Sequence, residues 1–217
     1  GLVPLHYLIP QPSALITAMT LHIERVETKQ QLRDFIRVPW TVYQNDPHWV
    51  PWLYFERLEF FDKTKNPFFE HADADFFIAR RDGRPIGAIA ALVNQRHNDF
   101  HGENVAHFGC FELLNDPEAA AALLETACAW ARGRGVDKIL GPMNLSTNDE
   151  CGTLIEGFDD APRVLMTYNP RYYLDFFEAN GFTKAMDLLA WRTDINKLVH
   201  HMPEKVTRVL SKIQQRY

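Results

Sequence analysis

Cysteine is scarce in this sequence, and a long apolar run is missing. Three cysteines occur in 217 residues, Cys110, Cys128 and Cys151, and no two of them form a Cys-x-x-Cys pair. An odd number of widely spaced cysteines indicates free thiols in a reducing compartment and excludes a disulfide framework. No apolar segment approaches the ~20 residues that a membrane-spanning helix requires. We therefore expect a cytoplasmic protein without a membrane partner.

An excess of basic residues is also missing. The chain has 23 Lys and Arg against 28 Asp and Glu, for a net charge of −5. Proteins that coat nucleic acid usually present a broad basic face, so we expect no nucleic-acid partner. With 46% hydrophobic residues and fifteen Phe, the sequence is rich enough in apolar side chains to exclude disorder and to build one core.

Residues 1–18 contain no formally charged side chain and have three prolines, so they lack the basic start and continuous apolar centre of a signal peptide. We interpret them as an N-terminal extension or a cloning remnant. Residues 19–196 are expected to form one domain. The remainder, 197–217, contains a basic amphipathic helix over 203–217 that is expected to act as a linker or docking segment.

The first third of the sequence predicts a strand and two helices. Residues 21–26 alternate apolar and polar side chains, as in a strand. Thr28 and Gln31 have the spacing of a capping box and predict a helix start, while Pro39 is expected to interrupt or end that helix. A second helix is predicted from about Pro51 to Phe61, within a strongly aromatic stretch.

Turn signals then mark a hairpin and further elements. Asp82-Gly83 separates two strand-like segments, 75–81 and 85–93, because glycine tolerates the positive φ of a tight turn. A polar loop is predicted over 94–104 and a strand over 105–114. Asp116 and Pro117 predict the cap and first position of a helix that ends near Gly133. The later expected elements are strands 138–140, 164–166 and 188–193 and a helix over 170–180.

The segment 141–182 contains the densest group of polar side chains. Six polar residues fill the seven positions 144–150, directly after a predicted strand, and such loops commonly line small-molecule sites. We predict Glu150 as a base that deprotonates an amine. The predicted substrate-binding residues are Asn144, Ser146, Asn148, Asp149, Tyr168 and Asn169. The alternative is that these polar residues cap the following elements and satisfy backbone groups.

Three other sets of residues are candidate sites. His71, Asp73 and Asp75 form His-x-Asp-x-Asp, which places ligand-type residues on one face of a strand. His97 and His101 add two imidazoles, with Asp99 between them, but nothing fixes a third or fourth ligand, so we predict no metal site. Cys151 could be a nucleophilic thiolate, but no hydrolase signature surrounds it, and a structural thiol is the alternative.

Four segments resemble an uncharacterised bacterial branch of the GCN5-related N-acetyltransferase (GNAT) superfamily, probably its N-terminal half. They are DFIRVPWTVYQNDPHWVP (34–51), NPFFEHADADFFIARRDGRPIGAIAALVN (66–94), GPMNLSTNDECGTLIEGFD (141–159) and YNPRYYLDFFEANGF (168–182). The resemblance covers about 21–192. It implies an α/β (α+β) acyl-CoA N-acyltransferase fold, with a mixed, mostly antiparallel sheet, splayed central strands and flanking helices.

The resemblance also implies a cofactor, acetyl-CoA or another acyl-CoA, held where strands 105–114 and 138–140 diverge. Its thioester would lie near backbone groups of Phe108, Gly109 and Cys110. A small-molecule amine would approach from the side of the early helices. Proteins of this branch tend to carry a second acyltransferase-like half after a helical linker, so residues 203–217 are expected to join such a domain or to form a homodimer.

Two positions depart from the family pattern. Where the family cradles pyrophosphate with backbone N–H groups, this chain has Asp116, Pro117 and Glu118, whose charges have the wrong sign for phosphate. Phe177 stands where many members have a tyrosine that protonates the leaving thiolate. Tyr172 or Tyr173 could substitute as the acid. The resemblance implies an N-acyltransferase that acts on an amine. The two departures favour the alternative, a catalytically silent GNAT-like module that binds a small ligand or supports a second domain.

Overall fold

The computed structural model describes residues 20–192, 194, 196 and 203–214. Two compact units are found, 1–183 and 184–217, and each is described by itself. The predicted N-terminal extension, Thr193 and the last three residues of the predicted terminal helix lie outside the described residues.

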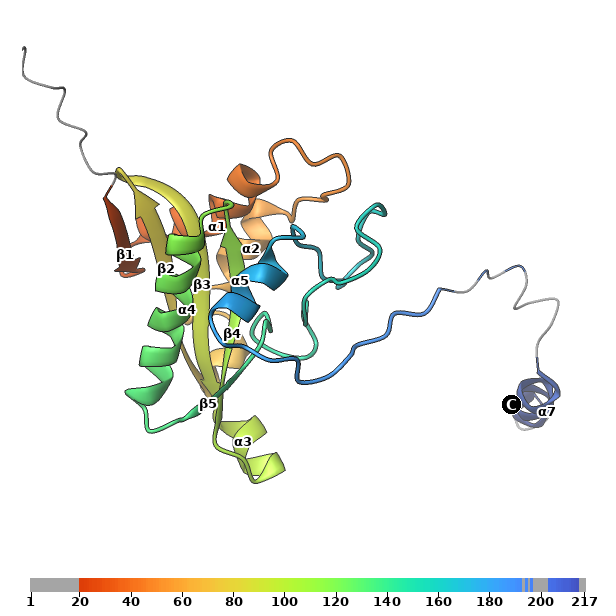
Figure 1. Ribbon diagram of the computed structural model, residues 1–217. Helices are drawn as coiled ribbons and strands as arrows, with labels where there is room; N and C mark the ends of the chain where they lie inside the picture. Colours follow the sequence, from red (N-terminus) through yellow and green to blue (C-terminus); the bar gives the residue numbers. More distant parts are fainter. Residues whose placement is uncertain (1–19, 193, 195, 197–202, 215–217) are drawn as a thin grey trace, which may run out of the picture. The chain divides into compact units, whose positions relative to one another are not determined.

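The first unit is built on a five-stranded sheet with the order β1-β2-β3-β4-β5 (Figure 1). Neighbouring strands are antiparallel, except that β4 and β5 are parallel. The predicted mixed, mostly antiparallel sheet is therefore confirmed. The strands are β1 (Leu21–Arg25), β2 (Ala72–Arg81), β3 (Arg84–Asn94), β4 (Val105–Leu113) and β5 (Lys138–Leu140).

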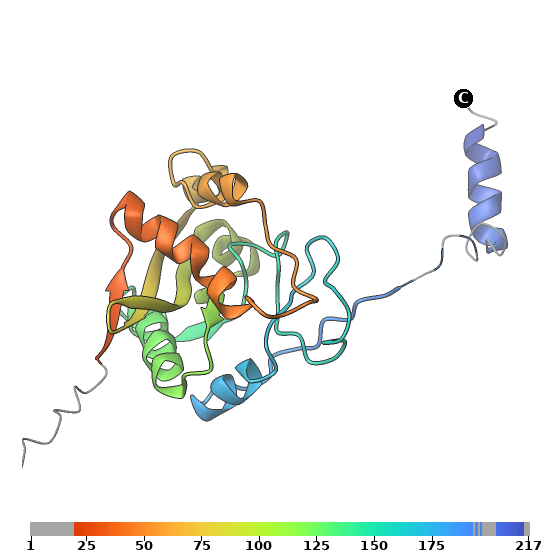
Figure 2. The ribbon, with the colours of Figure 1, turned by 90° about the horizontal axis from the view of Figure 1, so that it is seen from above.

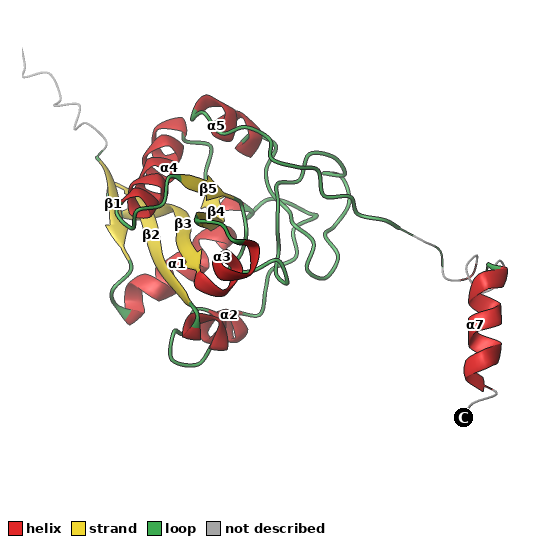
Figure 3. Ribbon diagram, turned by 90° about the horizontal axis from the view of Figure 1, so that it is seen from below, coloured by secondary structure: helices red, strands yellow, loops and turns green. Residues whose placement is uncertain are grey.

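Helices cover both faces of this sheet. The helix α4 packs on one face, and α1 and α2 lie on the other (Figure 3). The helices of this unit are α1 (Lys29–Val42), α2 (Tyr54–Phe60), the short 3-10 helix η1 (Pro67–Glu70), α3 (Gln95–His101), α4 (Pro117–Arg132) and α5 (Tyr173–Ala179).

Three local predictions are confirmed. Thr28 accepts a hydrogen bond from the Gln31 backbone while the Gln31 side chain returns to the Thr28 backbone, which is the capping box of α1. Asp82 and Gly83 turn the β2–β3 hairpin with φ values of 51° and 79°. The Asp116 carboxylate caps α4 by accepting from the Ala119 N–H at 3.1 Å.

The predicted break at Pro39 is wrong, because α1 continues to Val42 with the proline inside it. The Tyr43 N–H donates to the Pro39 carbonyl at 2.9 Å and closes the last turn. Pro39 is buried beside Phe35 and Val38, so packing against the sheet offsets the hydrogen bond that the proline ring removes.

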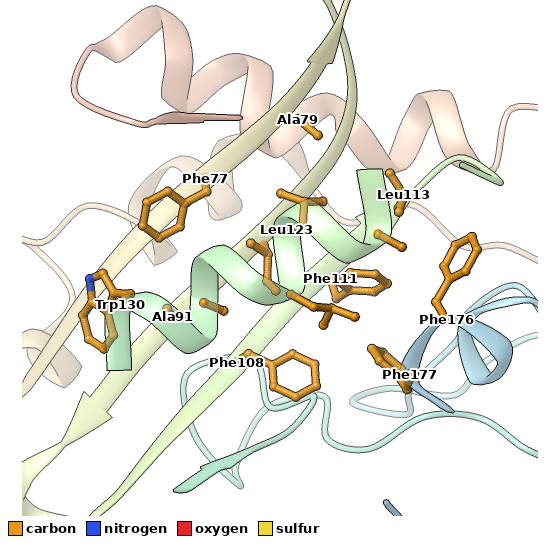
Figure 4. Close-up of a cluster of buried hydrophobic side chains, with 14 of the residues drawn as sticks. Phe77, Ala79, Ala91, Phe108, Phe111, Leu113, Leu123, Trp130, Phe176 and Phe177 are labelled. Carbon is orange, nitrogen blue, oxygen red and sulfur yellow. The ribbon is translucent and has the colours of Figure 1, made fainter. Parts of the chain in front are cut away.

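Strand β3 separates two apolar clusters. Ile89 and Ala91 belong to the cluster under α4, whereas Ala88, Ala90 and Leu92 belong to the cluster under α1 and α2. This alternation is the two-residue period of a strand that is buried on both faces. Figure 4 shows the first cluster, in which aromatic rings from β4 and α5 meet side chains of α4.

Three predicted elements need correction. The expected loop 94–104 contains α3, which Asn94 caps at the His97 N–H and Gly102 ends with φ of 64°. Residues 164–166 and 188–192 do not form strands. Their apolar side chains stay exposed, as in Val164 (91%) and Trp191 (89%), and no ladder partner holds them extended.

The second unit contains α7 (Glu204–Gln214), within the predicted terminal helix. Its apolar residues, Val206, Val209, Leu210 and Ile213, recur at helical spacing and remain about half exposed. In the part of the chain that the structure describes, every helix is too short or too polar to cross a membrane.

Candidate functional site

A bulge in β4 organises the candidate site. The β3–β4 register runs from Ala88 opposite Glu112 to Ala90 opposite Gly109, so β4 has one extra residue there. Cys110 takes a positive φ of 47° at this bulge. Phe108 and Phe111 consequently both face the α4 side of the sheet, and Cys110 and Glu112 face the α1 side.

A small, partly enclosed cavity lies on the α1 side of the bulge. Its volume is about 30 Å³, which is enough for at least one water molecule. Apolar residues of α1 and β3 form much of its wall, and a few polar groups of β4, α2 and the segment after β5 complete it. The lining residues are Phe35, Ile36, Pro39, Trp52, Arg57, Phe61, Ala88, Cys110, Glu112 and Asn144.

Glu112 is the carboxyl group of this cavity. The Tyr173 hydroxyl donates to Glu112 Oε2 at 3.1 Å and accepts from the Leu113 N–H at 2.6 Å. Burial raises the pKa of Glu112 to about 8, and the negative charge of Glu150 raises it further, while the nearby Tyr43 and Tyr173 hydroxyls offset part of the effect. Glu112 is therefore a carboxyl group that changes protonation near neutral pH.

A chain of tyrosines connects the loop after α1 to the segment before α5. The Tyr43 hydroxyl donates to the Tyr168 carbonyl at 3.2 Å, and the Tyr168 hydroxyl donates to Asp46 Oδ2 at 2.8 Å. Burial raises the pKa of both tyrosines above the ordinary value. Figure 2 shows the loop after α1 beside the segment that follows β5. Tyr168, predicted as substrate-binding, thus holds two loops together.

Glu150 and Arg57 form a buried ion pair beside the cavity. Arg57 Nη2 lies 3.2 Å from Glu150 Oε1, and the two side chains are 12% and 11% exposed. Trp52 Nε1 donates to the same oxygen at 2.8 Å. The Arg57 guanidinium lies 4.6 Å from the Trp52 ring and 4.8 Å from the Phe60 ring, a cation–π arrangement that fixes its plane.

Asn144 joins this ion pair to the bulge. Its Nδ2 donates to Glu150 Oε2 at 3.3 Å, and its Oδ1 accepts from the Cys110 N–H at 2.7 Å. Sequence analysis predicted Asn144, Glu150 and Cys110 as site residues, and the structure brings the three together.

The β4–β5 ladder ends after three residue pairs, and the next residues lie beside β4. The Met143 N–H donates to the Phe108 carbonyl at 2.8 Å. Gly109 and Gly141 permit this approach, because a Cβ at Gly109 would overlap the Met143 carbonyl and one at Gly141 would overlap the Phe108 carbonyl. The Phe108 carbonyl lies on the edge of β4 where the resemblance places a thioester. It is therefore already hydrogen-bonded within the chain.

The start of α4 does not fit a pyrophosphate. Arg81 binds Asp116 through two hydrogen bonds of 2.7 and 2.9 Å and binds Glu118 at 2.8 Å. Both carboxylates thus lie at the end of the helix where a phosphate would need positive potential. Of the predicted cofactor residues, Phe108 and Cys110 are hydrogen-bonded to the segment after β5, and Gly109 pairs with Ala90 of β3. Acyl-CoA binding by this chain stays a prediction.

Three of the predicted substrate-binding residues form a local turn. The Ser146 hydroxyl donates to Asp149 Oδ2 at 2.8 Å and accepts from the Asn148 N–H at 3.2 Å. Burial raises the pKa of Asp149, and its contact with Ser146 counteracts the shift. None of these three lines the cavity, and their contacts are those expected of the capping alternative.

Asn169 and Tyr172 also bind backbone. Asn169 is buried, with Oδ1 accepting from the Leu154 N–H at 2.6 Å and Nδ2 donating to the Pro170 carbonyl at 2.9 Å. The Tyr172 hydroxyl donates to the Leu113 carbonyl at 2.8 Å. Of the two tyrosines weighed as an acid, Tyr173 is the one that contacts the carboxyl group of the cavity.

Phe177 lies in the core. Its ring is 5.6 Å from that of Phe108 and 5.1 Å from that of Phe111, within the cluster of Figure 4. These contacts are those of an aromatic plug between α5 and β4.

The carboxylates weighed as metal ligands make ion pairs. Asp75 is 5% exposed and accepts from Trp130 Nε1 at 2.7 Å and from Arg25 Nη2 at 2.8 Å. Asp73, on the same strand, is exposed and pairs with Arg134 at 2.7 Å. Among the residues that the structure describes, no group of three His, Cys, Asp or Glu is arranged to hold a metal ion.

Cys151, weighed as a nucleophile, pairs through its backbone with Met143 in an isolated β-bridge. Burial raises the pKa of its thiol, and the charge of Asp149 raises it further, so the protonated thiol is favoured over the thiolate.

Sequence reasoning missed Glu112 and Arg57 as site residues, and it placed Trp52 and Tyr43 only in an aromatic stretch that either packs as a helix pair on the sheet or forms the wall of a substrate or partner groove. One signal for Glu112 was present, since it is the single charged residue in the apolar run Val105–Leu114 apart from His107. For Arg57, Trp52 and Tyr43 the sequence offers only membership of the aromatic stretch after the first helix, which does not separate site residues from helix packing.

Comparison with known proteins gives two curated bacterial relatives. Protein YghO of Escherichia coli (strain K12) is 37% identical over 188 residues, which cover 82% of this chain and 48% of the relative. Bacterial ceramide synthase of Caulobacter vibrioides (strain NA1000 / CB15N) is 37% identical over 179 residues, which cover 82% and 47%. The chain thus spans about half the length of the curated relatives it matches. No family model matches it.

Among solved structures, the fold is similar to aminoglycoside N-acetyltransferase AAC(6')-Iy in complex with CoA. The two chains are 15% identical, the match covers 86% of this chain and 99% of the other, and the TM-score is 0.47. The mixed sheet with flanking helices that the GNAT resemblance implies is present in this chain, as its strand order and the parallel β4–β5 pair show.

Proposed function

We propose that the chain forms the amine-binding part of an N-acyltransferase, with Glu112 as the base that accepts a proton from the acceptor amine. One observation carries this proposal: a half-buried carboxyl group with a pKa of about 8 faces a small cavity at the bulge of a central strand. A base is most effective when its pKa lies near the working pH, and burial has moved Glu112 into that range.

The proposed reaction is transfer of an acyl group from a thioester, such as acetyl-CoA or another acyl-CoA, to an amine. The amine nitrogen bonds to the acyl carbon as the carbon–sulfur bond breaks, and the thiol leaves. Glu112 takes the proton that the amine loses. Tyr173 donates its hydrogen bond to this carboxyl group, so it is the better placed of the two tyrosines to return a proton toward the leaving thiolate.

Glu150, predicted as the base, is given a different role in this proposal. Its carboxylate already accepts from Trp52, Arg57 and Asn144. These three hydrogen bonds hold the carboxylate in place beside the cavity. We assign Glu150 the positioning of Arg57 and Asn144 around the cavity.

One of the two relatives supports a reaction of this class. Bacterial ceramide synthase is named for the formation of ceramide, and ceramides are amides of an amine and a fatty acid. Since the chain matches about half of that protein, its own acceptor, its acyl chain and any second domain belong to the proposal.

A catalytically silent GNAT-like module is the second candidate. It is favoured by Asn144, whose side chain occupies the Cys110 N–H, and by the carboxylates of Asp116 and Glu118 at the start of α4. Under this candidate the cavity binds a small ligand, or the module supports a second domain, without acyl transfer.

Release of free CoA from acetyl-CoA and palmitoyl-CoA in the presence of primary amines tests the proposal, with chromatographic detection of CoA. Glu112→Gln should lower the rate by about 100-fold or more, in the range of general-base catalysis. Glu59→Gln, an exposed carboxylate of α2 that pairs with Lys65, is the matched control and should stay within about twofold. No release by the unmodified chain, together with no thermal shift at millimolar acyl-CoA, would reject the acyltransferase in favour of the silent module.

A further inference from the structure

A buried imidazole lies where α3 meets β4. His107 is 2% exposed, and its Nδ1 has no hydrogen-bond partner among the described residues. It lies three positions before the bulge at Cys110 and pairs with Leu140 at the end of the β4–β5 ladder. The cavity at the bulge does not include it. Because a buried polar atom without a partner is costly, His107 is a candidate for a role outside the cavity.

Two more imidazoles and one carboxylate lie around His107. The ring of His97, on α3, is 5.1 Å from that of His107, and the ring of His101 is 4.5 Å from that of His97. His97 Nε2 is 3.7 Å from Glu103 Oε2, and the other Glu103 oxygen is 4.0 Å from Lys138 Nζ of β5. Of these contacts Glu103 supplies the only negative charge, and Lys138 already shares it.

The closed arrangement of α3 on β4 favours a neutral His107. Burial lowers the pKa of His107 to about 4; the charge of His97 lowers it further, that of Glu103 raises it, and that of Lys138 lowers it. An imidazolium carries an N–H on both ring nitrogens. In the closed structure the Nδ1–H would therefore be a charged donor without an acceptor among the described residues.

Few buried contacts hold α3 against β4. Asn98 is the buried residue of this helix, with Nδ2 donating to the Val105 carbonyl at 3.1 Å and Oδ1 accepting from the Val105 N–H at 3.3 Å. By contrast, α4 buries seven residues against the sheet. Segments with few buried apolar contacts open at a lower free energy than the rest of the fold, so α3 should detach from the sheet more easily than α4.

We infer that α3 is an acid-released cover of β4: a proton that binds His107 shifts residues 94–104 toward a state detached from β4, while α4 stays folded. In the detached state water reaches the imidazolium and accepts from its Nδ1–H. The proton comes from the solvent, and no other bond is made or broken. This inference is independent of the proposed function, since it uses neither Glu112 nor the cavity that Glu112 lines.

Hydrogen exchange of the full chain at pH 7, 6 and 5, read by mass spectrometry, tests the inference. Because the pKa of His107 is lower in the closed state, that state loses stability as the pH falls below the ordinary value of 6.5. From pH 7 to pH 5 the open fraction should rise about 20-fold, as pKa values of 6.5 and about 4 require. The protection factors of 95–107, corrected for the intrinsic effect of pH on exchange, should fall by the same factor.

The exchange of α4 is the internal reference for this measurement. Its protection factors should stay within about threefold over the same pH range, because α4 remains packed on the sheet. Unchanged protection of 95–107 would overturn the inference. An equal fall in α4 would do so as well, since the acid would then unfold the domain as a whole.

His107→Gln assigns the response to His107. Glutamine is polar and does not titrate, so protection of 95–107 in this variant should change by less than about threefold between pH 7 and pH 5. His22→Gln is the matched control: His22 is an exposed histidine of β1, and this variant should keep the full response. If His107→Gln responds like the unmodified chain, another group takes up the proton and the inference fails.

An NMR titration of the unmodified chain keeps the inference testable should His107→Gln fail to fold, which thermal unfolding reports. The His107 ring should titrate with a midpoint between 4 and 6.5, below the ordinary value. A midpoint at 6.5 with the protection of 95–107 intact would contradict the inference, because the closed state would then accept the proton without cost.

Discussion

Replacing Glu112 by glutamine should make the protein more stable at high pH relative to the unmodified chain. In the folded state burial raises the pKa of Glu112 to about 8, from an ordinary value of 4.5. A group whose pKa is higher in the folded state stabilises the fold below its unfolded pKa, and this contribution is lost as the pH rises through the folded pKa. Glutamine has a similar shape and does not titrate, so it removes this loss.

The expected size follows from the two pKa values. Between pH 4.5 and 8 the free energy of unfolding of the unmodified chain should fall, relative to Glu112→Gln, by about 1.4 kcal/mol per pH unit. From pH 5 to pH 8 the difference between the two proteins should therefore change by about 3–4 kcal/mol in favour of the variant. Tyr173 can still donate to the glutamine oxygen, so the hydrogen bond that it makes to Glu112 is kept.

Urea unfolding at pH 5, 6.5 and 8 measures this difference, since other titrating groups are common to both proteins and cancel. Glu59→Gln removes an exposed carboxylate of α2 and should track the unmodified chain within about 0.5 kcal/mol at every pH. A gap between Glu112→Gln and the unmodified chain that stays constant over this pH range would refute the buried, high-pKa carboxyl group on which the proposed base depends.

Two further predictions concern the stability of variants at Asp75 and at Gly109. Asp75→Asn should lower the free energy of unfolding in urea by about 2–4 kcal/mol, because it breaks a buried charge network. Asp73→Asn breaks an exposed ion pair and should lower it by less than about 1 kcal/mol. Equal losses in the two variants would contradict this account. Gly109→Ala should cost about 1–3 kcal/mol in the same assay, because the added Cβ overlaps the Met143 carbonyl, and an unchanged unfolding midpoint would show that residues 141–144 move away from β4 easily.

Elements with a local signal could be predicted from the sequence. The capping box at Thr28, the Asp82-Gly83 turn and the Asp116 cap each depend on residues within three or four positions, and each is found where it was predicted. The same kind of signal existed for α3, whose Asn94 cap and Gly102 end stand in the expected loop, but its polar composition outweighed them.

Elements that depend on distant contacts could not be predicted in this way. Pro39 remains helical because its ring is buried against the sheet, which the local sequence does not show. The segments 164–166 and 188–192 have the composition of strands, yet strand formation requires a hydrogen-bonded neighbour, and the described structure gives them none.

The candidate site was predictable only in part for the same reason. The polar segment after β5 contributes Asn144 to the cavity and Glu150 to its ion pair, as its composition suggested. Glu112 is brought to the same cavity by the bulge at Cys110, and a bulge reverses the faces of the residues that follow it without leaving a pattern in the sequence. Arg57 joins Glu150 across 93 positions, a separation that no spacing rule covers.

The acceptor side and the donor side of the proposed site differ in how their groups are bound. On the side of the acceptor amine, Glu112 and Arg57 line the cavity. The pKa of Glu112 is about 8, and the buried Nε of Arg57 is a hydrogen-bond donor without an acceptor among the described residues. On the donor side, the Cys110 N–H is held by Asn144, and α4 starts with two carboxylates. An acyl donor that uses the bulge of β4 must displace Asn144 from Cys110 and break its link to Glu150. Acyl transfer at this bulge would therefore require the segment after β5 to move when the acyl donor binds.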